Sequence, residues 1–305
     1  MCALFGFLDY GHRFPTKILQ RLVQALANAS EIRGDHASGI AYMKGGSLTI
    51  YKRPKPAHKL HFKLPRGTSA VMGHTRFTTQ GSEKVNCNNH PFRGHAGTDF
   101  ALAHNGVLYN DRELRREKHL PETQIETDSY IAVQLLEAQN ELSFESLKQM
   151  AEDVCGSCTF TILDTENALW FVKGSSPLYL VHFPEFGLYA YASTKEIMQS
   201  ALKRTILQYM RRDVIAVDEG QILRIDAKGQ TACGRFDPFV LAKEFEWELS
   251  YCDDELEQLL NICGCFGVTE DEVLQMLEMG YTYDDIEEWL FCPTAYKRAL
   301  LEGEL

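Results

Sequence analysis

Short apolar runs, each ending in polar or glycine-rich residues, dominate the first part of the chain. The run 2–8 carries no charged residue, which is typical of a buried strand. Residues 16–29 place leucine, isoleucine and valine at helical spacing. The apolar runs 40–43 and 48–51 flank Gly45-Gly46, which is typical of a hairpin. We therefore predict a strand, a helix and a hairpin, in that order.

The same pattern predicts the elements that follow. Two further strands, 71–72 and 100–103, each run straight into a polar motif. Helices are expected from Thr127 to about 140, and from a Ser143 cap to about 154. Beyond them we predict strands at 159–164, 169–173, 178–183 and 187–192, a helix at 194–203, and strands at 214–217 and 221–226. Blocks of strands separated by helices indicate an α+β fold of two packed sheets with helices outside.

The last 66 residues differ in composition. Residues 240–305 hold 3 basic and 17 acidic residues, a net charge of −14, whereas residues 1–239 hold 28 and 25, a net charge of +3. This shift predicts two domains, 1–236 and 237–305, with the boundary near Asp237-Pro238. The tail has four amphipathic segments, near 253–263, 270–279, 283–291 and 294–302. Two of them begin with capping-box patterns, at 269–272 and 282–285, so we expect a small helical module.

Composition excludes several classes of protein. No apolar run is long enough to cross a membrane and the start has no signal-peptide pattern, so a cytoplasmic protein without a membrane partner is expected. No clustered basic stripe indicates nucleic-acid binding. Nine cysteines without a secretory context argue against a disulfide scaffold. The single CxxC, Cys155–Cys158, lacks a second pair, so we interpret its thiols as buried and expect no metal or cofactor.

Cys2 is a candidate nucleophile. The initiator methionine is normally removed before a small second residue, and Cys2 would then carry both a thiol and a free α-amine. An α-amine with a pKa of about 7.7–8.0 can accept the thiol proton near neutral pH. A Met-Cys start alone has little specificity, so this interpretation depends on the motifs that follow.

Three later motifs supply the rest of a site for a free amino acid. Arg76 lies in the polar stretch 73–81, Asn105-Gly106 ends an apolar strand, and Asp128 lies at a helix start. Taken singly, they read as a surface charge, a turn and a helix cap. Taken together, an arginine can bind an α-carboxylate, an aspartate an α-ammonium, and an asparagine amide beside a glycine N–H an oxyanion.

These motifs, in order and spacing, resemble the class II glutamine amidotransferase domain of the N-terminal nucleophile hydrolases, in particular the glutaminase half of glucosamine-6-phosphate synthase. The resemblance covers about residues 2–226, through Cys2, 33–39, 74–77, 89–91, 104–106 and 126–128. It implies a four-layer α-β-β-α sandwich. Two positions beside the substrate arginine depart from the synthase: Phe77 replaces a tryptophan and Gln80 a histidine. These two differences put in doubt the shape of the loop that would close over the substrate.

The resemblance also implies residue roles. Cys2 would be nucleophile and base, and Asn105 with Gly106 would form the oxyanion hole. Arg76, with Thr79 nearby, would hold the α-carboxylate, and Asp128 the α-ammonium. The supporting residues comprise Arg33, which would brace the strand of the nucleophile, and His90, which is either structural or lines the site.

The implied reaction is hydrolysis of the side-chain amide of L-glutamine to L-glutamate and ammonia through a Cys2 thioester. The ammonia would be released or passed to an acceptor enzyme or synthase subunit. Hydrolysis of another γ-glutamyl amide remains an alternative, as does a regulatory protein with a retained fold and no activity. An acylase or bile-salt-type hydrolase also begins with Met-Cys, but the Arg76 and Asp128 pair argues against it.

The tail has its own open alternatives. Residues 273–281 and 285–290 resemble, over a short stretch, a ubiquitin-associated three-helix module. The other interpretation is a plain acidic helical cap. In both cases the apolar faces would be buried, and the acidic face would be left to solvent or to a basic partner.

Overall fold

A seven-stranded antiparallel sheet holds the start of the chain at its centre. β1 (Ala3–Asp9) lies between β12 and β4, and the strand order is β13-β11-β12-β1-β4-β2-β3. The computed structural model describes residues 2–239, 256, 259–260, 263, 268–283 and 285–286. The other strands of this sheet are β2 (Ala37–Lys44), β3 (Ser47–Arg53), β4 (Ala70–Arg76), β11 (Tyr179–Phe183), β12 (Leu188–Ala192) and β13 (Asp213–Ile215).

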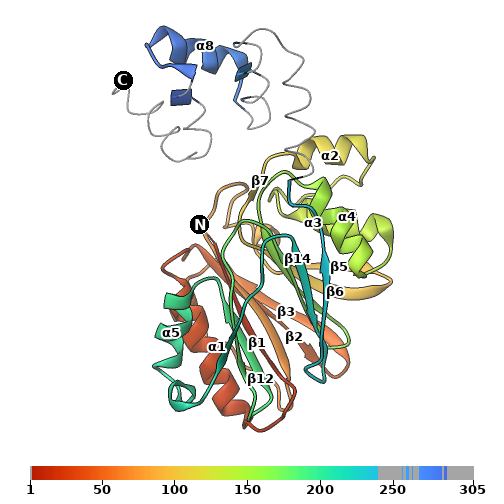
Figure 1. The fold of residues 1–305 in the computed structure, drawn as a ribbon, viewed down its shortest axis with the longest axis vertical. Coiled ribbons are helices and arrows are strands. Elements are labelled where there is room, and N and C mark those ends of the chain that lie inside the picture. The colour runs from red at the N-terminus through yellow and green to blue at the C-terminus, as the bar shows by residue number, and fades with distance from the viewer. Residues whose placement is uncertain are drawn as a thin grey trace. The chain divides into compact units, whose positions relative to one another are not determined.

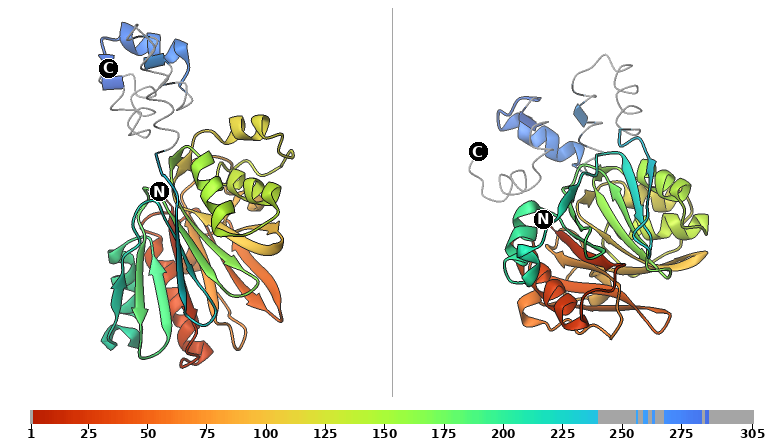
Figure 2. Two further views of the ribbon diagram at one scale, coloured as in Figure 1. Left: turned by 45° about the vertical axis from the view of Figure 1, so that its right-hand side comes forward. Right: turned by 60° about the horizontal axis from the view of Figure 1, so that its bottom comes forward.

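A six-stranded antiparallel sheet faces the first, as the ribbon views show (Figures 1 and 2). Its order is β15-β14-β10-β9-β6-β5. The strands are β5 (Phe92–Ala96), β6 (Thr98–His104), β9 (Thr159–Asp164), β10 (Leu169–Lys173), β14 (Gln221–Ile225) and β15 (Thr231–Arg235). β7 (Val107–Leu108) follows directly after the Asn105-Gly106 turn and forms a short separate pair with β8 (Gly156–Ser157).

Helices cover the outer faces of both sheets (Figure 2). α1 (Thr16–Ser30) and α5 (Lys195–Leu202) pack on the seven-stranded sheet. α2 (Asp111–Glu117), α3 (Tyr130–Gln139) and α4 (Phe144–Asp153) pack on the six-stranded sheet. Three short 3-10 helices complete the unit: η1 (Ala57–Lys59), η2 (Asn86–Asn88) and η3 (Ile206–Tyr209). The predicted four-layer α-β-β-α sandwich is therefore confirmed.

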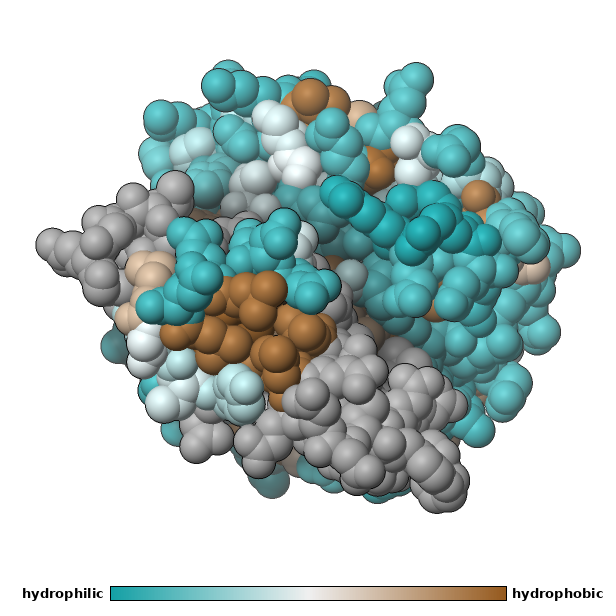
Figure 3. All heavy atoms as spheres, turned by 90° about the horizontal axis from the view of Figure 1, so that it is seen from above, coloured by the Kyte–Doolittle hydropathy of each residue, from teal (hydrophilic) through white to brown (hydrophobic). Residues whose placement is uncertain are grey.

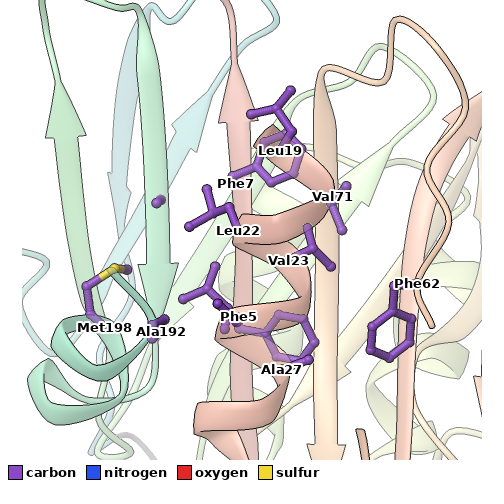
Figure 4. Packing of buried hydrophobic residues seen from close by; sticks show 14 of the residues in the cluster. Phe5, Phe7, Leu19, Leu22, Val23, Ala27, Phe62, Val71, Ala192 and Met198 are labelled. Carbon is purple, nitrogen blue, oxygen red and sulfur yellow. The ribbon is translucent and has the colours of Figure 1, made fainter. Parts of the chain in front are cut away.

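The residues of β1 show how the layers are held together. All seven are buried, and they alternate between two cores. Phe5 and Phe7 pack with Leu22 and Val23 of α1, as the close view shows (Figure 4). Leu4, which points the other way, joins the core between the two sheets. A strand buried on both faces needs no polar alternation, which explains the continuous apolar run in the sequence.

One local prediction needs correction, and some elements were missed. The second predicted helix begins at Tyr130 rather than Thr127, because the side chains of Thr127 and Asp128 bond to other segments instead of capping the helix. Several elements were not predicted, namely α2, β5, β7, β8 and β15. The Ser143 cap of α4 is confirmed as a capping box with Ser146.

The chain divides into two compact units, Met1–Pro238 and Phe239–Leu305. In the second unit, α8 (Glu270–Glu278) begins with the predicted capping box between Thr269 and Glu272. Its apolar face belongs to a small buried cluster that includes Leu259 and Ile286. Figure 3 shows apolar surface on this unit, where Leu274 and Met279 are partly exposed. Most of the other helices predicted for the tail lie outside the described residues.

Within the described residues, no helix is long and apolar enough to cross a membrane.

Candidate active site

Cys2 lies directly before the central strand of the seven-stranded sheet and is 9 % exposed. Its Sγ is 3.4 Å from both the backbone N and the backbone O of Phe77. Burial raises the pKa of the Cys2 thiol, and the hydrogen bond with the Phe77 backbone only partly offsets this effect. The thiol is therefore protonated at neutral pH, and a reaction at sulfur needs a base.

The antiparallel register brings the ends of several strands together around Cys2. Ala3 of β1 pairs with Thr75 of β4, so Arg76 at the end of β4 lies at the same edge as Cys2. In turn, Ala37 at the start of β2 pairs with Arg76. The sequence motifs, distant along the chain, thus converge at one edge of the sheet because alternate strands run in opposite directions.

Arg33 joins the nucleophile to the predicted oxyanion hole. Its Nε donates to the backbone O of Cys2 at 2.8 Å, and its Nη2 donates to Oδ1 of Asn105 at 3.4 Å. One guanidinium therefore spans the start of β1 and the residue that follows β6 of the opposite sheet. The Nδ2 of Asn105 lies 3.5 Å from Oγ of Ser193. Both ends of the buried Asn105 amide are thereby oriented by protein groups.

Gly106 can only be glycine in this backbone. Its φ of +144° is one that other residues rarely adopt, and a Cβ would lie 1.8 Å from the backbone O of Ser157. Among the described residues, no hydrogen bond is made to its N–H. The turn thus presents the Asn105 side chain beside an N–H that is free to donate, the combination expected of an oxyanion hole.

Asp128 is buried just before α3. One of its carboxylate oxygens, Oδ2, accepts from the backbone N of Leu108 at 2.7 Å, and the other lies 3.4 Å from Oγ of Ser129. Burial raises the pKa of the Asp128 carboxyl, which three hydrogen bonds and the charge of Arg76 oppose. A cation bound beside it would favour the ionised form, as an α-ammonium would.

The structure gives Arg76 more contacts than the sequence indicated. Its guanidinium is buried, and it donates to the backbone O of Gln80 at 2.5 Å and of Gly81 at 3.0 Å. It also donates to Oδ1 of Asn89 at 2.8 Å and Oγ1 of Thr127 at 3.2 Å. Arg76 therefore fixes the loop that follows β4, and this organising function was not predicted. Its contact with substrate stays a prediction.

The loop after β4 carries the other predicted substrate contact. Thr79 is exposed on this loop, and it makes no hydrogen bond among the described residues. Phe77, one of the two departures from the synthase pattern, is 40 % exposed and stacks on the ring of His36 at 4.9 Å. Thr78 N donates to Nδ1 of the same His36 at 3.0 Å. The loop is thus held by a histidine that directly precedes β2.

His90 lies in a buried cluster of rings behind the site. Its ring centroid is 4.2 Å from that of His74 and 4.3 Å from that of Phe92. Neither ring nitrogen of His90 makes a hydrogen bond within the described residues. His74 Nε2 donates to the backbone O of His104, the residue before Asn105. The His90 ring thus packs against a histidine that bonds to the residue before Asn105, and whether His90 also lines the site stays a prediction.

Sequence reasoning missed three polar residues that hold the site together. Ser193, Asn89 and Thr127 are all buried and bond to predicted site residues or to their neighbours. Ser193 follows an apolar run, and Asn89 and Thr127 lie within the motifs 89–91 and 126–128. The sequence does not show which partner each of the three bonds to.

The sequence is similar to a known family and to several known enzymes. Residues 74–200 match the glutamine amidotransferase domain model. The chain is 28 % identical over 241 residues to glutamine–fructose-6-phosphate aminotransferase of Bacillus cereus, covering 76 % of this chain and 38 % of that protein. It is 32 % identical over 190 residues to the Streptococcus pyogenes enzyme, covering 59 % and 30 %. The chain thus spans less than two-fifths of these relatives.

The fold has a solved counterpart in glutamine phosphoribosylpyrophosphate amidotransferase from B. subtilis. The TM-score is 0.60 at 21 % identity, covering 77 % of this chain and 49 % of that one. At 21 % identity this likeness shows the fold alone. The likeness to glutamine amidotransferases in sequence comes from the family model and the relatives above. Residues 74–200 thus match a glutamine amidotransferase domain, in a chain whose two stacked antiparallel sheets bring Cys2 to the Asn105-Gly106 turn.

Proposed function

We propose that the protein hydrolyses the side-chain amide of L-glutamine to L-glutamate and ammonia, and that the ammonia passes to an acceptor enzyme or synthase subunit. The observation that carries this proposal is the Arg33 bridge, which holds the Cys2 strand and the Asn105 amide against each other. Nucleophile and oxyanion donor must have this fixed relation for acyl transfer.

The first half of the reaction forms a thioester. Once Met1 has been removed, the α-amine of Cys2 takes the thiol proton, and the sulfur attacks the amide carbon of the substrate. Negative charge then develops on the amide oxygen, where Asn105 Nδ2 and the Gly106 N–H donate. The protonated amine returns its proton to the leaving nitrogen, so the C–N bond breaks and ammonia departs.

The second half restores the enzyme. Water attacks the thioester, with the same α-amine accepting its proton, and the C–S bond breaks to give a carboxylate and the Cys2 thiol. Asp128 would hold the substrate α-ammonium, and Arg76, with Thr79, would hold the α-carboxylate. The raised pKa of the buried Asp128 carboxyl agrees with a site that awaits a cation.

The test is product analysis by mass spectrometry. Protein lacking Met1 is incubated with L-glutamine and with a panel of γ-glutamyl amides, beside a Cys2→Ala control. Glutamate and ammonia from glutamine, absent in the control, are expected. Turnover of another γ-glutamyl amide but not of glutamine would establish the alternative substrate. No turnover of any of them would favour a regulatory protein that keeps only the fold.

A further inference from the structure

Ser193 lies where the two sheets meet at the site. It follows β12, which pairs with β1, and its side chain is 1 % exposed. Its Oγ accepts from the backbone N of Leu4, two residues after the nucleophile, at 2.8 Å. The Nδ2 of Asn105, which follows β6 of the opposite sheet, lies 3.5 Å from the same Oγ. One hydroxyl thus contacts both the strand of the nucleophile and the amide of the oxyanion hole.

The donors and acceptors around Asn105 fix which way its amide points. Arg33 has only donors, so the amide group 3.4 Å from it must be the carbonyl oxygen, and the amide nitrogen then faces Ser193. The nitrogen carries two hydrogens. One points toward Ser193, and the other remains for a ligand. A flipped amide would place N–H groups against Arg33 and would leave no amide donor on the Ser193 side.

The hydroxyl of Ser193 has no part in capping the helix that follows it. The residue that caps α5 is Thr194, whose side chain accepts from the N–H of Ile197. The hydroxyl of Ser193 is therefore not needed to begin the helix. Both of its contacts, Leu4 N and Asn105 Nδ2, lie next to residues of the site. The contact with Asn105 is long for a hydrogen bond, so we expect it to orient the Asn105 amide and to add little binding energy.

We propose that Ser193 is a positioning residue for hydrolysis, holding the Asn105 amide with one N–H directed at the developing oxyanion. The inference rests on the proposed function, because it concerns the same reaction. The pair Arg33 and Ser193 acts as a two-sided clamp on a single amide. This arrangement orients the oxyanion donor before substrate arrives, which lowers the cost of reorganisation in the transition state.

The test compares Ser193→Ala with a matched control, Ser38→Ala. Ser38 is equally buried, on β2 of the same sheet, and its Oγ makes no hydrogen bond among the described residues. Ser193→Ala is expected to lower kcat roughly tenfold with KM within about twofold, since a contact realised in the transition state is lost. Ser38→Ala is expected to keep the wild-type kcat.

A double-mutant cycle separates positioning from a structural role. In an Asn105→Ala background, Ser193→Ala should cause no further loss, because the amide it orients is gone. An equal loss in both backgrounds, or an unchanged kcat in Ser193→Ala, would overturn the proposal. If Ser193→Ala does not fold, Ser193→Cys fills the position with a somewhat larger group, offers only a weak acceptor and is judged by the same criteria. A wild-type protein without turnover would instead refute the proposed function itself.

Discussion

His90→Phe is predicted to make the protein more resistant to acid while leaving hydrolysis intact. The His90 ring lies between His74 and Phe92, is 3 % exposed, and has no hydrogen bond at either nitrogen within the described residues. Burial, with the nearby charges of His74 and Arg76, holds the pKa of His90 well below its usual range. A phenyl ring keeps the aromatic packing against His74 and Phe92 and removes two buried polar atoms that have no partner among the described residues.

The size of the acid effect follows from the neighbouring histidines. Burial lowers the pKa of both His74 and His104 to about 3. The unfolded chain binds these protons near the ordinary pKa of 6.5, so stability falls as pH drops from about 6.5 toward 3. At pH 5 each of the two costs about 2 kcal/mol, together about 4 kcal/mol of a typical total of about 5–15 kcal/mol. His90 contributes in the same direction.

The measurement is urea unfolding at pH 7.5 and pH 5.0, followed by circular dichroism. The wild-type midpoint should fall strongly at pH 5.0, and the midpoint of His90→Phe should fall less. The control is His61→Phe, the same change at an exposed histidine, which should retain the wild-type pH dependence. An equal fall in wild type and His90→Phe would contradict the argument from burial. A folded His90→Phe without turnover would show that His90 acts in the site.

Three further predictions concern the reaction. Protein that retains Met1 should be inactive because its Cys2 nitrogen is an amide, and intact-mass measurement should find the active form without methionine; full activity with Met1 present would exclude the amine as base. Asn105→Ala should lower kcat about 10²–10³-fold with little change in KM, and steady-state kinetics showing a rise in KM alone would refute its assignment. Arg76→Ala and Asp128→Ala should chiefly raise the KM for glutamine. Thermal unfolding should show a loss of stability in both, because Arg76→Ala releases the loop carbonyls and Asp128→Ala leaves the Leu108 N–H without its acceptor.

The strands and helices with a distinct apolar pattern could be predicted from the sequence, and those without one could not. The run 2–8 became β1 because it is buried on both faces. β15 is an edge strand whose residues are mostly exposed, and α2 buries only Asp111 and Leu114, so neither shows an apolar pattern that periodicity can detect. The order of strands in the sheets depends on contacts between distant residues, and it was not predicted; the family resemblance implied only the order of the four layers.

The site shows the same limit at the level of side chains. Cys2, Asn105 and Asp128 could be proposed because their chemistry is specific and each lies at one end of a predicted strand or helix. The double contact of Arg33 depends on the distance between two sheets, which no local pattern contains. At Thr127 the local preference for a helix cap conflicts with the tertiary contacts. Its type and position indicate a helix cap, but its hydroxyl donates to the backbone O of Asn88 in the loop held by Arg76. Tertiary bonding overrode the local preference at a functional position.

The acidic tail leads to the last prediction, that truncation after Asp237 leaves a folded, active glutaminase. We propose 1–236 as the catalytic domain and 237–305 as a separate helical module. Among the described residues, the three cores of the sandwich extend no further than Phe236, whereas the fourth core lies within 259–286. Phe236 is 6 % exposed, and its N–H donates to the backbone O of Gly220 at 2.9 Å. A cut after Asp237 keeps this anchor.

A cut two residues earlier, after Arg235, is the matched control. It removes the buried ring of Phe236 and should cost about 3–5 kcal/mol, the usual effect of deleting a buried phenylalanine side chain. The chain 1–237 should instead unfold in urea at the same midpoint as the first transition of the full-length protein. It should also keep the wild-type kcat on glutamine. In that case the net charge of −14 on residues 240–305 serves something other than catalysis, and docking to a basic acceptor enzyme gains weight. If the chain 1–237 is insoluble, the tail covers apolar surface of the catalytic domain, and the reason to propose an acidic docking module disappears.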